Sequence, residues 1–232
     1  MIAGIFPETS LGIIGGFGPD TSTKFQLSII HQFQKKFNRQ PKVVMVNAPV
    51  TKQAEKLAIK GDPRLLREFL VDSVKTLCSA NVSVIVLPCN TAHVFISDLR
   101  KESKVPVISI IEKVAEFISK RFSKVGLLAT SSTINFGLFQ KEFSKANIQL
   151  ILPFPDQQKD VDKIIQKLLD CGKSNKQIDC DTNTITKSLR NRGTEVILLA
   201  CTDLQFINFG ATNIPIIDSL QVLKDVSLGI LK

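Results

Sequence analysis

The stretch V-S-V-I-V-L-P-C-N-T-A-H, from Val82 to His93, decides the fold. It begins with a run of apolar and β-branched residues, which is the composition of a buried strand. A proline ends this run and Cys89 follows, with Asn90 and Thr91 behind it as candidate helix caps. We therefore predict a thiol at the carboxyl end of a strand, facing the amino end of a helix whose amides stabilise a thiolate.

A second stretch, T-E-V-I-L-L-A-C-T-D from Thr194 to Asp203, has the same design. Cys201 follows an apolar run, and Thr202 is the capping hydroxyl. The segment Val125–Thr130 repeats the pattern of Leu11–Gly16, and each segment precedes its cysteine by nearly the same number of residues. Such an internal duplication predicts two units of like topology, each delivering one cysteine. Because ligands bind beyond the carboxyl ends of strands in open α/β sheets, we expect both thiols at a ligand site.

These patterns predict an α/β protein with two pseudo-symmetric, doubly wound domains, mainly parallel sheets and an active-site cleft between the domains. The first domain is expected at residues 1–104 plus 215–232 and carries Cys89. The second is expected at residues 105–214 and carries Cys201. The predicted elements include strands at Leu11–Ile14, Lys42–Ala48, Val82–Leu87, Val105–Ile110 and Ile148–Leu152, helices at Arg64–Ala80 and Val161–Leu169, and a loop at Pro153–Gln158.

Composition excludes several classes of protein. The chain has 232 residues, 44% of them hydrophobic, which suffices for one large or two small globular domains. No apolar run approaches the roughly 18–20 residues of a membrane span, and the start lacks a signal-peptide pattern, so a cytoplasmic location is expected. The net charge of +9 comes from basic residues that alternate with acidic ones, and Trp and Tyr are absent. We therefore expect no nucleic-acid partner.

The five cysteines favour free thiols over a disulfide framework, because their number is odd and no export signal is evident. Two histidines and no C-x-x-C motif leave no zinc pattern, so we expect no metal. A pair of thiols suits proton transfer at a carbon atom, because one can act as thiolate base while the other acts as thiol acid.

Four segments together resemble the aspartate/glutamate racemase superfamily, and most closely its aspartate racemase and broad-specificity amino-acid racemase branch. They are G-I-I-G-G-F-G-P (Gly12–Pro19), P-C-N-T-A-H (Pro88–His93), V-G-L-L-A-T-x-x-T (Val125–Thr133) and A-C-T-D (Ala200–Asp203). This resemblance implies an isomerase that racemises a small amino acid without a cofactor such as pyridoxal phosphate, and frequent homodimers. It also implies that Cys89 and Cys201 are the catalytic acid/base pair. The substrate-binding residues that we infer from it are Phe17, Gly18, Lys52, Gln53, Asn90, Thr91, Thr130, Thr133 and Thr202.

Departures from the family pattern leave the substrate open. Aspartate-specific members carry an arginine for the side-chain carboxylate, whereas Pro49–Ala54 contains none and offers Lys52 or Gln53 instead. The family lysine at the start of a later helix aligns with Asp160. Aspartate, glutamate or another amino acid therefore remains a candidate.

Three residues near the motifs also have open roles. Asp20, His93 and Asp203 either assist the thiols or serve the structure alone. Other readings of the whole chain are a maleate isomerase or hydantoin racemase of the same superfamily, and a non-catalytic protein that binds small anions.

Overall fold

The computed structural model describes residues 9–51, 53–54, 64–170, 178–179, 182–209 and 212–231. The chain forms two compact units. The first comprises Met1–Pro88, Ala92–Ile110 and Leu223–Lys232, and the second comprises Cys89–Thr91 and Ile111–Val222. The domain boundaries expected from the sequence stay a prediction.

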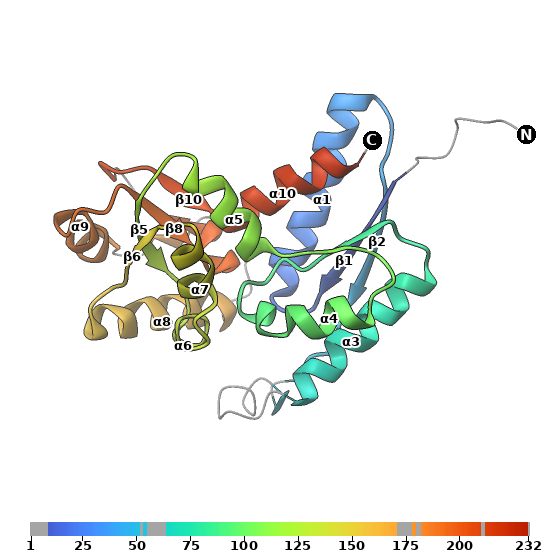
Figure 1. The fold of residues 1–232 in the computed structure, drawn as a ribbon, viewed down its shortest axis with the longest axis horizontal. Helices are drawn as coiled ribbons and strands as arrows, with labels where there is room; N and C mark the ends of the chain where they lie inside the picture. The colour runs from blue at the N-terminus through green and yellow to red at the C-terminus, as the bar shows by residue number, and fades with distance from the viewer. Residues whose placement is uncertain are drawn as a thin grey trace, which may run out of the picture. The chain divides into compact units, whose positions relative to one another are not determined.

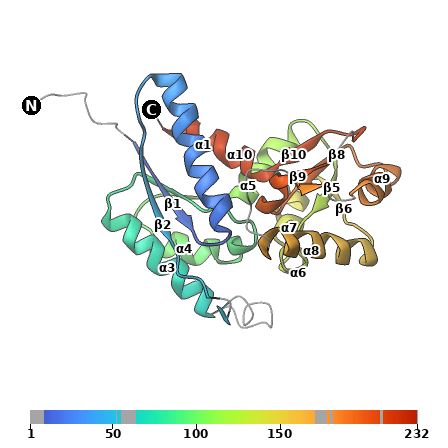
Figure 2. The same ribbon diagram turned by 180° about the vertical axis from the view of Figure 1, so that it is seen from behind.

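The first unit is built on a sheet of four parallel strands in the order β2-β1-β3-β4. Gly12 on the central strand β1 pairs with Val44 on one side and with Ile85 on the other. Helix α1 covers one face of the sheet, and α3 and α4 cover the other (Figures 1 and 2). The elements are β1 (Ser10–Gly15), α1 (Pro19–Phe37), β2 (Lys42–Asn47), α3 (Arg64–Ser79), β3 (Val84–Val86), α4 (Ile96–Glu102) and β4 (Val107–Ile108).

The second unit repeats this plan, with four parallel strands in the order β10-β8-β5-β6. Gly126 on the central strand β5 pairs with Ile151 and with Ile197. A separate parallel pair joins β7 to β9. The elements are α5 (Ile110–Ser119), β5 (Lys124–Leu128), α6 (Ser131–Asn135), α7 (Leu138–Lys145), β6 (Gln149–Ile151), α8 (Pro155–Asp170), β7 (Ile178–Asp179), α9 (Asn183–Asn191), β8 (Val196–Leu199), β9 (Ile207–Asn208), β10 (Ile216–Asp218) and α10 (Ser219–Ile230), of which α5 and α10 extend into the first unit.

The inner strands are mostly apolar, as expected where helices cover both faces of a parallel sheet. All residues of β1, β3 and β8 are buried, as is usual for parallel sheets, whose crossover helices lie on both faces. The prediction of an α/β fold with parallel sheets is confirmed.

The predicted loop at Pro153–Gln158 is wrong, because α8 already begins at Pro155. Proline fits the first position of a helix, where the missing N–H would have no partner within the helix. The Gln157 side chain reaches back and accepts a hydrogen bond from the backbone N–H of Phe154 at 3.2 Å. The polar residues after Pro155 thus form the first turn of a helix.

The helix expected behind Cys89 is confirmed, because the 3-10 helix η1 (Thr91–Phe95) runs directly into α4. Behind Cys201 the expected helix is only the short 3-10 helix η2 (Thr202–Phe206). Cys201 itself is the N-cap of η2 and makes no side-chain capping bond, so Thr202 is not the cap. After η2 the chain enters strand β9 rather than more helix.

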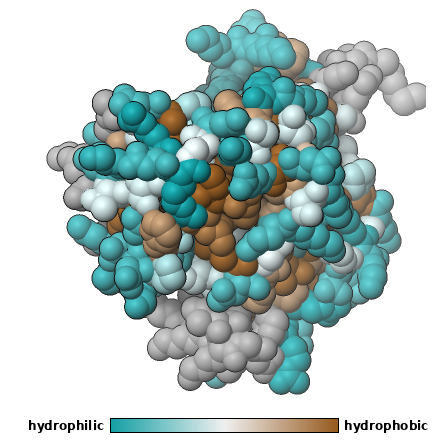
Figure 3. Space-filling model, turned by 60° about the vertical axis from the view of Figure 1, so that its left-hand side comes forward, coloured by the Kyte–Doolittle hydropathy of each residue, from teal (hydrophilic) through white to brown (hydrophobic). Residues whose placement is uncertain are grey.

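Hydrophilic residues cover most of the face of the described residues that Figure 3 shows. Within these residues, no helix combines the length and the apolarity that crossing a bilayer requires. Apolar residues do reach the face shown in Figure 3, among hydrophilic ones. Large side chains with substantial exposure include Leu27, Phe154 and Leu169.

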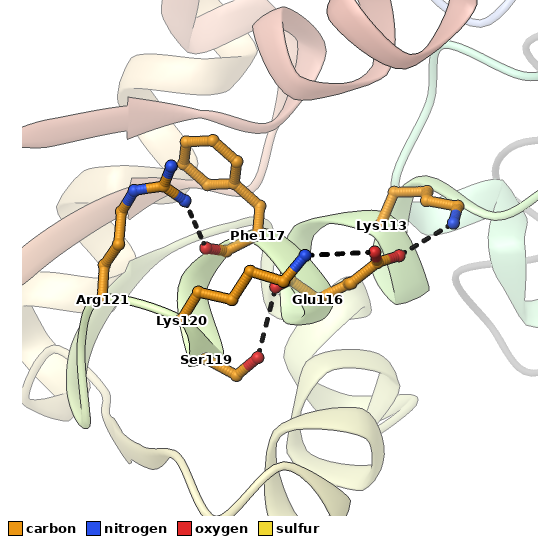
Figure 4. A network of polar contacts seen from close by, with 6 residues as sticks. All are labelled: Lys113, Glu116, Phe117, Ser119, Lys120 and Arg121. Atoms are coloured by element: carbon orange, nitrogen blue, oxygen red, sulfur yellow. Dashed lines mark hydrogen bonds and ion pairs between the residues drawn. The ribbon is translucent and has the colours of Figure 1, made fainter. Parts of the chain in front are cut away.

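Some of the basic side chains pair locally with an acidic one on α5 and just after it. Glu116 accepts hydrogen bonds from Lys113 at 2.8 Å and from Lys120 at 3.4 Å (Figure 4). The hydrogen bond from Lys113 is the main cause that lowers the pKa of Glu116 below its usual value. Arg121 lies over the ring of Phe117 and donates to the Phe117 carbonyl oxygen. These are solvated contacts of the kind expected from the alternation of charges.

Candidate active site

Both predicted cysteines lie beyond the carboxyl ends of inner strands of their sheets. Cys89 follows β3 and is partly exposed, whereas Cys201 follows β8 and is buried. Both carry free thiols, as does Cys78 on α3. In open α/β sheets, ligands bind in the crevice beyond the carboxyl ends of the strands. Each thiol therefore lies where this fold binds ligands.

Cys201 contacts a carboxylate from its own 3-10 turn. Its Sγ donates to Oδ2 of Asp203 at 3.8 Å, and Asp203 is only 5% exposed. This contact arises from η2, because the 3-10 turn brings the side chain of Asp203, two residues after Cys201, back toward the thiol. Asp203 was an open candidate in the sequence, and its carboxylate does contact the thiol.

Three threonine hydroxyls form a cluster that we call the hydroxyl triad: Thr91, Thr130 and Thr133. The Thr91 Oγ1 atom lies 2.7 Å from that of Thr133 and 3.3 Å from that of Thr130, and the last two are 3.0 Å apart. Thr130 is the N-cap of α6 and accepts the Thr133 N–H at 3.2 Å. Thr91 and Thr130 are partly exposed and Thr133 is buried. The triad thus offers hydroxyl groups to a small polar ligand.

Asn90 is buried beside the cysteine, and its amide is held at one end. Its Nδ2 donates to Oγ of Ser219 at 3.0 Å, at the start of α10, instead of capping a helix behind Cys89. Its Oδ1 is buried and has no hydrogen-bond partner among the described residues. An acceptor that is buried without a donor is costly, which marks this oxygen as a place for a donor from a ligand.

His93 has a structural contact. It is buried, and its Nε2 accepts the backbone N–H of Ile110 at 3.1 Å, at the first residue of α5. An accepting Nε2 carries no proton, so the neutral ring has its proton on Nδ1. This contact ties the turn behind Cys89 to the start of α5.

The remaining predicted site residues are Phe17, Gly18, Lys52, Gln53 and Thr202. Phe17 and Gly18 lie in the turn before α1, where Gly18 has φ 98° and precedes Pro19 at the helix start. Gln53 is exposed, and Thr202 is buried as the first residue of η2. Lys52 lies outside the described residues.

Contacts that the sequence did not predict involve Gln158, Asp162 and Ser219. Each is far along the chain from the residue that it holds, and no local pattern signals such a contact. Among the described residues, no cluster of three or more His, Cys, Asp or Glu side chains is placed to hold a metal ion. The polar groups collected here are hydroxyls, one amide and thiols, which suit a small organic ligand.

Comparisons with known proteins identify the family. Residues 14–224 match the model of the family described as Asp/Glu/Hydantoin racemase. The chain is similar to the broad specificity amino-acid racemase RacX of Bacillus subtilis, with 26% identity over 219 residues, 92% of this chain and 94% of that protein.

Solved structures extend the likeness to the fold. An aspartate racemase homologue from Pyrococcus horikoshii has a TM-score of 0.75 at 26% identity, over 95% of this chain and 97% of that chain. The aspartate racemase of Picrophilus torridus has a TM-score of 0.72 at 25% identity, over 97% and 96%. Racemases are isomerases, so the family is enzymatic. The chain belongs to the Asp/Glu/hydantoin racemase family.

Proposed function

We propose that this protein is a cofactor-independent amino-acid racemase that moves the Cα proton between Cys89 and Cys201. The observation that carries the proposal is the pair of free thiols, each beyond an inner strand of one of two equivalent parallel sheets. Membership of a racemase family supports the same chemistry. We further propose that the protein is a cytoplasmic homodimer.

In this mechanism one thiolate removes the Cα proton and the opposite thiol returns a proton to the other face of the carbon. The first sulfur ends as thiol and the second as thiolate, so the roles reverse in the other direction. Each such acid or base typically contributes about 10²–10⁴-fold to the rate. The S–H of Cys201 directed at Asp203 supports Cys201 as the proton donor in one direction.

The hydroxyl triad supports binding of the α-carboxylate, because Thr91 and Thr130 are partly exposed and their hydroxyls can turn protons toward an anionic group. The buried Oδ1 of Asn90 supports an amino group as its partner, since only a donor relieves that acceptor. Maleate has no N–H group, so this oxygen favours an amino acid over the maleate isomerase alternative. Thr202, beside Cys201, is proposed as a further substrate contact.

The side chain of the substrate is proposed to be that of aspartate, with glutamate and neutral amino acids as alternatives. Pro49–Ala54 lacks an arginine, and Lys is a point charge without the bidentate fork of Arg. A substrate site without an arginine to bind a side-chain carboxylate should discriminate less against amino acids with neutral side chains. The likeness to a broad-specificity racemase supports a wide range of substrates.

Hydrogen exchange at Cα, followed by NMR in deuterated buffer, tests the proposal. The protein is incubated with the L- and D-forms of aspartate, glutamate and alanine, together with Cys89→Ser and Cys201→Ser variants. Cys78→Ser is the matched control. Cys78 is also a free thiol, but it lies on α3, its Sγ is 3.7 Å from the Ser103 hydroxyl, and it has no part in the proposed chemistry.

We expect deuterium at Cα with loss of optical purity, reduced at least about 100-fold by either active-site substitution and unchanged by Cys78→Ser. No exchange with any panel member by the folded protein would refute the amino-acid racemase. Ligand binding without exchange, indifferent to both cysteines, would favour the binding-protein alternative. A covalent adduct with maleate would favour the isomerase.

A further inference from the structure

Two residues of α8, one helical turn apart, hold the loop between β5 and α6. Gln158 donates from Nε2 to the carbonyl oxygen of Ala129 at 2.9 Å. Asp162 accepts the backbone N–H of Ser131 at 2.9 Å and also accepts the Ser131 hydroxyl in a short hydrogen bond. Gln158 Nε2 lies 3.3 Å from Asp162 Oδ1, which links the two side chains.

These contacts bracket Thr130, a member of the hydroxyl triad. Ala129 precedes Thr130 and Ser131 follows it, so the backbone is held on both sides of the threonine. The Thr130 hydroxyl in turn lies 3.0 Å from that of Thr133. Moving the loop would therefore move Thr130 relative to the rest of the triad.

The orientation of the Gln158 amide is determined by its surroundings. Both neighbours of Nε2 are acceptors, namely the Ala129 carbonyl oxygen and the Asp162 carboxylate, so the NH₂ group must face them. The other amide atom, Oε1, is buried and has no hydrogen-bond partner among the described residues. A side chain needed only for packing would be better apolar, because an unsatisfied buried acceptor destabilises the fold.

We propose that Gln158 and Asp162 are positioning residues that set the hydroxyl triad for the carboxylate of the amino acid. This inference rests on the function proposed above. A carboxylate held by hydroxyls alone depends on their spacing, because hydrogen bonds weaken steeply with small displacements. The two side chains supply that spacing from outside the triad.

Steady-state kinetics on the L- and D-forms of aspartate, glutamate and alanine test this role. The variants are Asp162→Ala, Asp162→Asn and Gln158→Leu. Asp156→Ala is the matched control on the same helix, because that side chain is 97% exposed and forms an ion pair with Lys159 at 3.6 Å. Thermal unfolding of every variant is recorded in parallel.

Asp162→Ala is expected to raise KM about tenfold, the effect of losing one good hydrogen bond to the substrate, with kcat changed less than about threefold. The rise in KM measures the lost ground-state binding of the carboxylate, and any part of the contact that strengthens as Cα loses its proton appears in kcat. Asp162→Asn keeps an acceptor for the Ser131 N–H and should restore KM to within about threefold of wild type. Gln158→Leu should raise KM while keeping the fold, and Asp156→Ala should change neither constant.

Unchanged KM in Asp162→Ala and Gln158→Leu, with an active wild type, would overturn the positioning role and leave the racemase standing. Loss of melting temperature with kcat falling and KM constant would overturn it too, because that result describes a merely structural pair. A wild type inactive on the whole panel would overturn both proposals at once.

Discussion

The two halves of the protein share a plan and differ at the end of their central strands. The sheets have the same strand order, and Gly12 and Gly126 pair with Ile85 and Ile197 at equivalent positions. The residue four positions after each glycine lies just beyond the end of its strand. There the halves diverge, because the residue at that point is a glycine in one half and a threonine in the other.

Gly16 and Thr130 occupy these equivalent places with different chemistry. Gly16 has φ +100° and packs against the backbone of Ala48. Thr130 has φ −66° and offers its hydroxyl to α6 and to the hydroxyl triad. The first half therefore presents bare backbone at its turn and the second half presents side chains. A duplicated scaffold can keep its strands and specialise each half at the turns that follow them.

The largest effect on stability is expected from Gly16→Ala. A Cβ atom there would lie 2.3 Å from the carbonyl oxygen of Ala48, and φ +100° is a region that L-residues avoid. We expect a loss of about 3 kcal/mol or more in the free energy of unfolding, measured in urea. Gly137→Ala is the control, with φ +65° and no atom within 4 Å, and should lose about 1 kcal/mol. Equal losses would show that the close approach to Ala48 is unimportant.

The equivalence of the two sheets is tested by Gly12→Ala and Gly126→Ala. An added Cβ would lie 2.9 Å from Val82 Cγ2 in the first half and 2.9 Å from Thr194 Cγ2 in the second. Each substitution should cost about 1–3 kcal/mol by overpacking. Combining Gly126→Ala with Thr194→Ser removes the contacted methyl and should recover part of the loss in a double-mutant cycle. Strictly additive effects would contradict the contact.

The strands and the cysteines were predictable because their signals are local. Apolar runs that stop at a proline or a cysteine mark strand ends, and the repeated pattern around Gly12 and Gly126 predicted two sheets. The helices of the second half were harder to predict. The start of α8 was hidden by two prolines, and α9 was not predicted at all because its inward face has only a few apolar residues, such as Ile185 and Leu189.

The site was predictable only where a motif carries it. The motif that contains Cys89 also supplied Thr91, whereas the partners Ser219 and Asp162 lie 129 and 31 residues from the side chains that they hold. Such contacts depend on how strands and helices pack, and no local spacing reports them. Reading residues up to Gln158 as a loop also concealed that Gln158 and Asp162 lie on one helical face.

Replacing Thr194 by valine, and the equivalent Val82 by threonine, tests the comparison with a smaller expected change in the free energy of unfolding. Thr194 is buried, and its Oγ1 has no hydrogen-bond partner among the described residues, whereas the equivalent residue of the first half is valine. Thr194→Val should raise the free energy of unfolding by about 1 kcal/mol, or the melting temperature by about 2–4 °C. Val82→Thr should lower it by a similar amount. Destabilisation by Thr194→Val would mean that the hydroxyl is satisfied in solution.

The smallest effect concerns how each central strand is held at its start. In the first half Ser83 Oγ accepts the backbone N–H of Ser10 at 3.0 Å. In the second half Glu195 takes the equivalent place and accepts the backbone N–H groups of Ser123 at 2.7 Å and Lys124 at 3.0 Å. The hydrogen bond from Ser123 is the main cause that lowers the pKa of Glu195 from 4.5. One half is therefore held by a neutral group and the other by a group that titrates.

A lowered pKa in the folded state means that the carboxylate stabilises the fold above about pH 4.5, and that this stability is lost as the pH falls through the folded pKa. Glu195→Ser, which copies the first half, should lower the melting temperature slightly at pH 7. The difference from wild type should shrink as the pH is lowered below 4.5. Ser83→Ala is the control, and its effect should stay constant over the same range because no charge is involved. A Glu195→Ser effect that is equally independent of pH would show that the charge contributes nothing, so that both halves are held by hydrogen bonds alone.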